Sequence, residues 1–87
     1  MKSAQRVLIT GAGSGLGQAL AHRFAANGAQ VACVDIQFER LEATLATMSG
    51  SGHAAFAADV GNDDSMQAMA DAVLAEWGVP DVLINNA

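Results

Sequence analysis

A glycine-rich turn between an apolar run and a helical pattern is the part of this sequence most suited to chemistry. Residues 8–20 read LITGAGSGLGQAL, with glycines at positions 11, 13, 15 and 17. Glycine permits a positive φ and a close approach of backbone to ligand, and the N–H groups at a helix N-terminus favour a pyrophosphate. We therefore expect a nucleotide-binding turn. The alternative is a glycine-rich connection that binds no ligand.

The spacing of these glycines narrows the kind of site. The dinucleotide fingerprint G-x-G-x-x-G fails when counted from Gly11, because position 16 is Leu16, and when counted from Gly13, because position 18 is Gln18. The failure of this fingerprint makes a flavin a less favoured cofactor. No G-K-[ST] follows, so the turn is not a P-loop. The run fits the pattern T-G-x-x-x-G-x-G, which begins at Thr10.

One carboxylate is placed to discriminate between the two nicotinamide cofactors. Asp35 ends the second apolar run, where a carboxylate can accept hydrogen bonds from ribose hydroxyls and repel a 2′-phosphate. The next two residues, Ile36 and Gln37, are uncharged, as is Ser14 in the turn. The sequence therefore predicts NAD as the cofactor rather than NADP. The alternative is that Asp35 is solvated and caps the following helix.

Strands and helices that alternate along the chain must position these residues. Apolar runs closed by turn residues predict strands, and apolar residues at helical spacing predict helices between them. The expected strands are 6–10, 30–35, 53–59 and 81–85, and the expected helices are about 15–27, 38–48 and 62–77. This βαβαβαβ order predicts an α/β fold, a Rossmann-type doubly wound parallel sheet with strand order 3-2-1-4. The first two helices should cover one face and the third helix the other.

Each helix should bury the apolar stripe that its spacing creates. The residues expected on these stripes are Leu16, Leu20 and Phe24 on the first helix, Phe38, Leu41, Leu45 and Met48 on the second, and Met66, Met69, Ala70, Val73, Leu74 and Trp77 on the third. Cys33 lies in the middle of a strand, so we expect it to pack in the core.

Composition excludes several classes of partner. The 87 residues form one domain at most, with a net charge of −5 and four scattered Lys and Arg residues. This argues against binding to nucleic acid or to an anionic membrane. No apolar run approaches the ~20 residues that span a bilayer. Cys33 has no partner for an internal disulfide, which suits a reducing cytoplasm. His22 and His53 are isolated, so we expect no metal site.

Four motifs, taken together and in order, resemble the short-chain dehydrogenase/reductase family. They are T-G-x-x-x-G-x-G after the first strand, Asp35 after the second, Asp59-Val60 after the third, and Asn85 to Ala87 after the fourth. The resemblance implies that residues 1–87 are the N-terminal, NAD(H)-binding part of an oxidoreductase. Such an enzyme transfers a hydride between nicotinamide and a carbonyl or secondary alcohol substrate.

The resemblance also implies which residues surround NAD. The turn would bind the pyrophosphate and adenosine ribose through Gly11, Ser14, Gly15, Leu16 and Gly17. The ribose hydroxyls would bind Asp35, and the adenine would lie against Ile36, Asp59 and Val60. The nearer ribose would be approached by Asn86 and Ala87. Alternatively, aspartate and asparagine at strand ends only satisfy loop backbone.

The family's catalytic groups have no counterpart in this sequence. Members of the family use a tyrosine, a lysine four residues after it, and a serine, whereas this chain has no tyrosine and its only lysine is Lys2. We therefore expect no catalytic residue and no turnover, because the chain looks truncated before the catalytic half. The resemblance implies a homo-oligomer, dimer or tetramer, for the full-length enzyme. The alternatives are a non-catalytic dinucleotide-binding module and a fragment that a partner chain keeps folded.

Overall fold

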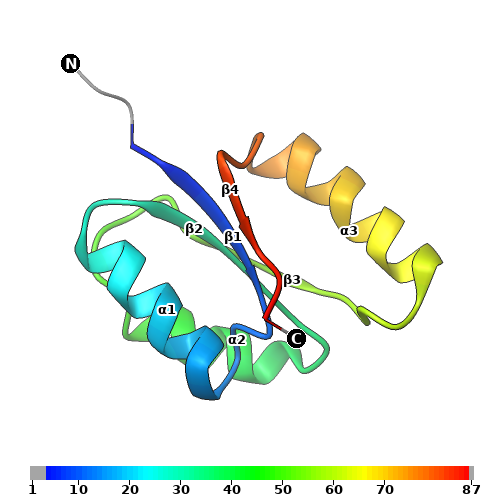
Figure 1. Cartoon of the computed structure of the whole chain (residues 1–87), viewed down its shortest axis with the longest axis horizontal. Coiled ribbons are helices and arrows are strands. Elements are labelled where there is room, and N and C mark those ends of the chain that lie inside the picture. The colour runs from blue at the N-terminus through cyan, green and yellow to red at the C-terminus, as the bar shows by residue number, and fades with distance from the viewer. Residues whose placement is uncertain (1–3, 87) are drawn as a thin grey trace.

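Strands and helices alternate in the computed structural model, which describes residues 4–86 (Figure 1). The predicted βαβαβαβ order is confirmed. The elements are β1 (Arg6–Thr10), α1 (Gly15–Ala26), β2 (Gln30–Asp35), α2 (Phe38–Ala46), β3 (Ala54–Ala57), α3 (Asp63–Glu76) and β4 (Val82–Ile84). None of the helices in this described range is long and apolar enough to cross a membrane.

Three elements are shorter than the sequence predicts, and one of them is β4, which covers only 82–84 of the predicted 81–85. The helix α2 stops at Ala46 rather than 48, because the N–H groups of Thr47 and Met48 bond to carbonyls three residues back and tighten the last turn. The strand β3 covers only 54–57 of the predicted 53–59, and alanine, a poor strand former, supplies three of its four residues. After Ala57 the chain leaves the sheet and enters the loop that holds Asp59.

The four strands form a parallel sheet in the order β3-β2-β1-β4, as predicted. In this register, Ile9 of β1 lies beside Cys33 of β2 on one side and Ile84 of β4 on the other. Because all strands point the same way, their carboxyl ends meet at one edge of the sheet. The glycine turn, Asp35 and the polar residues after β3 and β4 therefore gather at that edge.

Side chains of the central strands alternate between two apolar layers. Val7, Ile9 and Cys33 pack beneath α1 and α2, whereas Leu8 and Val34 pack beneath α3 on the opposite face. Figure 1 shows α1 and α2 together on one side of the sheet and α3 alone on the other. The predicted distribution of helices is confirmed, with two helices on one face and one on the other.

The face of α1 that packs on the sheet differs from the predicted one. Leu16 is 66% exposed, and the buried positions are Gly17, Ala21 and Ala25. Leu20 and Phe24 pack only around the edge of that contact. The predicted face was wrong because it followed the large apolar residues. Small residues allow a helix to lie close against a strand, and they form the contact here.

The stripe of α2 also needs a correction. Phe38, the first residue of the helix, is 42% exposed, while Leu41 is fully buried. The polar Thr44 shares the buried face and its hydroxyl lies 3.0 Å from the carbonyl oxygen of Ala12. A threonine can occupy this position because the glycine turn offers it a backbone acceptor.

Both histidines make hydrogen bonds that hold loops. In His53, Nδ1 accepts from the Val31 N–H at 3.1 Å and Nε2 lies 2.7 Å from the Ser49 carbonyl oxygen. In His22, Nε2 lies 2.8 Å from the Thr47 hydroxyl. Within residues 4–86, no group of three or more His, Cys, Asp or Glu side chains could hold a metal ion.

Candidate functional site

The glycine turn has the backbone shape that its sequence predicts. Gly11 and Gly15 have φ values of 69° and 57°, in the left-handed region that favours glycine. The helix α1 begins at Gly15, and Ser14, its N-cap residue, makes no side-chain hydrogen bond to the helix. The side chain of Ser14 thus leaves the first N–H groups of α1 open to a ligand, which an anion could use.

Two further glycines are required by close contacts. A Cβ atom on Gly17 would collide with the Gly11 carbonyl and lie 2.7 Å from Asn86 Nδ2. A Cβ atom on Gly13 would lie 2.8 Å from both Asp35 Oδ2 and the Cβ of Arg40. The turn therefore packs tightly against the end of β2, α2 and the residues after β4.

Asp35 is held in one orientation by the backbone. Its Oδ2 accepts a hydrogen bond from the Gly13 N–H at 3.0 Å, and its Oδ1 accepts one from the Gln37 N–H at 3.2 Å. The second bond is the local one expected if Asp35 served only to shape the loop before α2. The first is not local, because it joins the end of β2 to the glycine turn. A carboxylate held in this way is preorganised for a ligand at the turn.

A pocket of about 260 Å³ lies between the turn and the ends of β2 and β3. Its lining brings together five of the predicted site residues and adds Ala58: Gly11, Asp35, Ile36, Ala58, Asp59 and Val60. Ile36 is 62% exposed and Val60 45%, so apolar side chains of both loops are available to a flat ring. Two carboxylates and two exposed aliphatic groups around a glycine backbone suit a nucleoside.

Asp59 also serves its own loop. Its Oδ1 accepts a hydrogen bond from the Gly61 N–H at 2.9 Å, and its N–H donates to the Ser65 hydroxyl at 2.9 Å. Asp59 therefore does bond to the backbone of its own loop, which is the alternative to a ligand-binding role. The other oxygen of its carboxylate is the group that a ligand in the pocket could use.

The end of β4 is joined to β1 by one buried hydroxyl. Thr10 Oγ1 lies 3.1 Å from Asn85 Oδ1 and accepts a hydrogen bond from the Asn86 N–H at 3.0 Å. The Asn86 side chain reaches Gly17, not the 260 Å³ pocket. The predicted site residue Ala87 lies outside the described residues. Thr10, the first residue of the motif, thus positions the strand-four end of the site.

Four predicted turn residues lie outside the pocket, and two neighbours of the turn were missed. Ser14, Gly15 and Leu16 are exposed at the start of α1, Gly17 is buried there, and none of the four lines the pocket. The missed residues are Arg40, whose Nη1 donates to Ser14 Oγ at 3.4 Å, and Thr44. Their spacing of four residues places them on one face of α2, a signal that apolar periodicity alone ignores.

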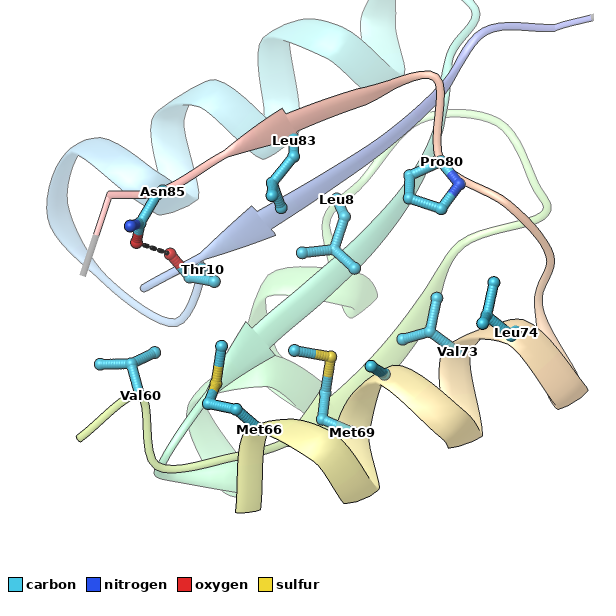
Figure 2. Close-up of a pocket in the computed structure, with 11 residues that line it drawn as sticks. Leu8, Thr10, Val60, Met66, Met69, Val73, Leu74, Pro80, Leu83 and Asn85 are labelled. Atoms are coloured by element: carbon cyan, nitrogen blue, oxygen red, sulfur yellow. Dashed lines mark hydrogen bonds between the residues drawn. The ribbon is translucent and has the colours of Figure 1, made fainter. Parts of the chain in front are cut away.

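A larger hollow of about 410 Å³ opens between α3 and the strands β1 and β4 (Figure 2). We call it the α3–β4 groove. Its lining is Leu8, Thr10, Val60, Met66, Met69, Ala70, Val73, Leu74, Pro80, Leu83 and Asn85. Figure 2 shows Leu8 and Leu83 of the sheet on one side of the hollow and the methionines of α3 on the other. No titratable side chain lines it, so the groove is suited to packing rather than to acid–base chemistry.

Leu74 corrects the predicted stripe of α3. It was expected to be buried with Met69 and Val73, yet it is 57% exposed on the groove. Leu83 of β4 is 66% exposed on the same hollow. The apolar stripe of α3 is therefore only partly buried: Met69 and Val73 pack on the sheet, whereas Leu74 remains exposed.

Similarity to known proteins agrees with this geometry. Residues 5–87 match a family model described as short chain dehydrogenase. The chain is 48% identical over 82 residues to D-threitol dehydrogenase of Mycolicibacterium smegmatis, a match that covers 92% of this chain and 32% of that protein.

Solved structures give the same result. A variant of actinorhodin polyketide ketoreductase with NADPH matches with a TM-score of 0.88 at 32% identity, over 97% of this chain and 33% of that one. The 3-ketoacyl-(acyl-carrier-protein) reductase from Brucella melitensis, complexed with NADH, matches with a TM-score of 0.83 at 37% identity, over 91% and 32%. The chain spans about a third of the length of these relatives. It belongs to the short-chain dehydrogenase family, whose dinucleotide-binding portion it carries.

Proposed function

We propose that this chain binds NAD(H) as the cofactor-binding portion of a short-chain oxidoreductase. The observation that carries the proposal is the 260 Å³ pocket, where the glycine turn meets the ends of β2 and β3. Gly11, Ser14, Gly15, Leu16 and Gly17 would hold the pyrophosphate and its ribose, Asp35 the ribose hydroxyls, and Ile36, Asp59 and Val60 the adenine. Asn86 and Ala87 would approach the nearer ribose.

The tight packing of the turn supports this assignment. A side chain at Gly13 or Gly17 would fill space that Asp35, Arg40, Gly11 and Asn86 already occupy. At these two positions the turn is therefore restricted to backbone, which suits a pyrophosphate held by backbone N–H groups. Bound NAD(H) would supply the hydride acceptor or donor, and this chain's residues would bind and orient the adenosine half.

The preference for NAD over NADP rests on Asp35. A carboxylate held by the N–H groups of Gly13 and Gln37 cannot easily turn away from a 2′-phosphate, so the two anions would repel each other. Among relatives, one solved structure carries NADPH and another NADH. Membership of the family alone therefore does not select one cofactor, and the charge around the pocket must do so.

Substrate chemistry belongs to parts of an enzyme that this sequence does not contain. We propose a small alcohol or carbonyl substrate for the full-length enzyme. That enzyme would act as a homo-oligomer in the cytoplasm. Without a tyrosine in the sequence, no phenol is present to move the substrate proton. The 87-residue chain should therefore bind cofactor without turning it over.

Calorimetric titration tests the cofactor assignment. The purified chain should bind NADH more tightly than NADPH, and Asp35→Asn should reduce that preference by about tenfold, since a repulsion of about 1.4 kcal/mol corresponds to that factor. Glu42→Gln, a charge-matched change at an exposed position of α2, should leave the ratio unaltered. Tighter binding of NADPH, or no binding of either cofactor, would contradict the assignment. Absorbance at the NADH band in the presence of alcohols should stay constant.

A partner-dependent fragment is the second candidate, and the α3–β4 groove favours it. An apolar hollow of about 410 Å³ with Leu74 and Leu83 exposed is a surface that soluble domains normally cover. β4 is also an edge strand whose outer hydrogen-bonding groups have no neighbour among the strands described. Further polypeptide packed on α3 and β4 would complete both the sheet and its second helical layer. A non-catalytic dinucleotide-binding module has no comparable observation in its favour.

A further inference from the structure

Thr44 is one of two polar residues buried in the part of the chain that the structure describes, the other being Thr10. It belongs to α2, yet its hydroxyl reaches the glycine turn, where it lies 3.0 Å from the Ala12 carbonyl oxygen. The side-chain amide of Gln18, in α1, donates to the same hydroxyl at 3.3 Å. The Thr44 hydroxyl therefore joins both helices of this face to the turn.

The single proton of this hydroxyl has two carbonyl oxygens within reach. Those of Ala12 and Arg40 both lie 3.0 Å from the Thr44 oxygen. The Arg40 carbonyl lies inside α2, where the N–H group four residues later is its regular donor. The Ala12 carbonyl belongs to a fully buried residue of the turn, and no backbone N–H among residues 4–86 donates to it. Since buried carbonyls need a donor, the proton of Thr44 goes to Ala12.

The peptide group between Ala12 and Gly13 is thus held at both ends. Its C=O accepts from Thr44, and its N–H, which belongs to Gly13, donates to Asp35 Oδ2 at 3.0 Å. A trans peptide is planar, so its C=O and N–H point in opposite directions. A hydroxyl that fixes the carbonyl on one side therefore also fixes the direction of the N–H on the other. One peptide unit connects the buried Thr44 to a carboxylate that lines the 260 Å³ pocket.

This peptide group would otherwise be free to turn over. Glycine at position 13 adopts positive and negative φ about equally well, so the backbone itself offers little resistance. A peptide turned over would direct the Ala12 carbonyl at the Asp35 carboxylate, and the two oxygens would repel each other. Thr44 opposes that rotation because its hydroxyl would lose its acceptor. The Asp35 carboxylate then keeps the bond from Gly13 that, with the one from Gln37, sets its orientation.

We propose that Thr44 is a positioning residue for the adenosine ribose. Through the peptide group of Ala12 and Gly13, it sets the direction from which Asp35 accepts the 2′-hydroxyl. This inference rests on the proposed function, in which Asp35 binds the ribose hydroxyls. Thr44 makes no contact of its own with the ligand, since it is fully buried and does not line the pocket.

Titration with two nucleotides isolates the 2′-hydroxyl. Adenosine 5′-monophosphate and 2′-deoxyadenosine 5′-monophosphate differ only in that group, so the ratio of their affinities measures its contact with Asp35. In calorimetry, the parent chain should bind the ribonucleotide about tenfold more tightly, the effect of one hydrogen bond to a charged group. Thr44→Val, which replaces the hydroxyl with a methyl group, should lower this ratio to about threefold or less. Thr44→Ser, which keeps the hydroxyl, should preserve it.

Thr47→Val is the matched control. Thr47 lies on the same helix, and its hydroxyl bonds to the Thr44 carbonyl at 3.1 Å and to His22 of α1 at 2.8 Å, but not to the turn. The same substitution there should leave the ratio unchanged. In a chain that carries Asp35→Ala, Thr44→Val should have no further effect on the ratio, because both changes act on one contact.

A second pair of variants allows for a valine that does not fit the buried site. Thr44→Ser and Thr44→Ala both lack the methyl group and differ only in the hydroxyl, so the comparison of their ratios is independent of Thr44→Val. Circular dichroism shows whether each variant folds. If neither Thr44→Val nor Thr44→Ala folds, the hydroxyl serves the fold itself and the inference is wrong.

The remaining outcomes separate this inference from the proposed function. If loss of the hydroxyl weakens both nucleotides equally, Thr44 supports the pocket as a whole and does not act on the ribose, so the inference is wrong while the pocket stands. If it changes neither affinity, the inference is wrong again. If the parent chain binds both nucleotides equally, or binds neither, the assigned role of Asp35 in the proposed function fails and the inference fails with it.

Discussion

Gly13 and Gly17 show that, at the scale of single residues, the candidate site depends on side chains that are absent. Each lies where an added Cβ atom would meet groups that are already hydrogen-bonded or closely packed. Gly61, whose added Cβ would lie no nearer than 3.4 Å from Asp59, shows the contrast of a glycine with space around it. The alternating glycines of the turn are therefore required by contacts made after folding as well as by backbone angles.

Cys33 is the residue whose environment most changes its chemistry. It is fully buried in the layer beneath α1 and α2, and burial raises the pKa of its thiol to about 12. The thiol is therefore protonated and unreactive at neutral pH. The prediction that Cys33 packs in the core is confirmed.

The raised pKa of Cys33 predicts how stability depends on pH. Above pH 9 the unfolded chain releases the thiol proton while the folded chain retains it, so the free energy of unfolding should fall as pH rises from about 9 toward 12. The sequence has no tyrosine and one lysine, so few other groups titrate in this range. Urea midpoints from pH 7.5 to 10.5 should fall for the parent chain and much less for Cys33→Ala. Parallel curves for the two proteins would show that the thiol is not responsible.

At the scale of elements, the loops before α2 and α3 are built differently although both lead to the pocket. Asn62, the N-cap residue of α3, accepts a hydrogen bond from the Ser65 N–H through its side chain at 2.8 Å. Gln37, the N-cap residue of α2, makes no such bond. Before α2 the Asp35 carboxylate accepts a hydrogen bond from the Gln37 N–H instead, and near the end of the helix the Thr44 hydroxyl donates to the Ala12 carbonyl of the turn.

This difference predicts unequal costs for the two caps. Asn62→Ala should destabilise the chain by about 1 kcal/mol, because it leaves an N–H group at the start of α3 without its acceptor. Gln37→Ala should change the free energy of unfolding by less than about 0.5 kcal/mol. Urea denaturation of both variants provides the measurement. Equal losses would mean that the Asn62 bond contributes nothing specific to α3.

At the scale of the whole molecule, the two faces of the sheet are unequally covered. Two helices pack on the layer that contains Ile9 and Cys33, whereas α3 alone packs on the layer that contains Leu8 and Val34. The part left open is the α3–β4 groove, at the side where β4 forms an edge of the sheet. The molecule therefore has its candidate site at the carboxyl edge of the sheet and an apolar surface that remains uncovered beside β4.

The groove predicts that the isolated chain associates with itself. Sedimentation over a concentration series should show dimers or larger species, and Leu83→Glu should weaken that association by about tenfold or more, because a charge would have to be buried at the contact. Val79→Glu is the control. Val79 is 69% exposed, close to the 66% of Leu83, but it does not line the groove. A parent chain that stays monomeric throughout, or two variants that behave alike, would argue against the groove as the contact surface.

Local patterns in the sequence determined the order of elements, the strand order and the composition of the turn. Hydrophobic period and turn residues are properties of short segments, and the handedness of crossovers then leaves few topologies. They also placed Asp35 and Asp59 at one edge of the sheet, where parallel strands end together, although Asp59 lies in the loop after β3 rather than in the predicted strand. The assignment of NAD to the pocket remains a prediction.

Only the tertiary structure decided which surfaces meet. It showed that small residues such as Ala21, not Leu16, form the contact of α1, because the distance between helix and strand is set by the glycines that allow it. It brought Arg40 and Thr44 to a turn some thirty residues earlier in the chain. It also left Leu74 and Leu83 uncovered. Periodicity identifies a face that can pack, but the position of neighbouring elements determines what packs on it.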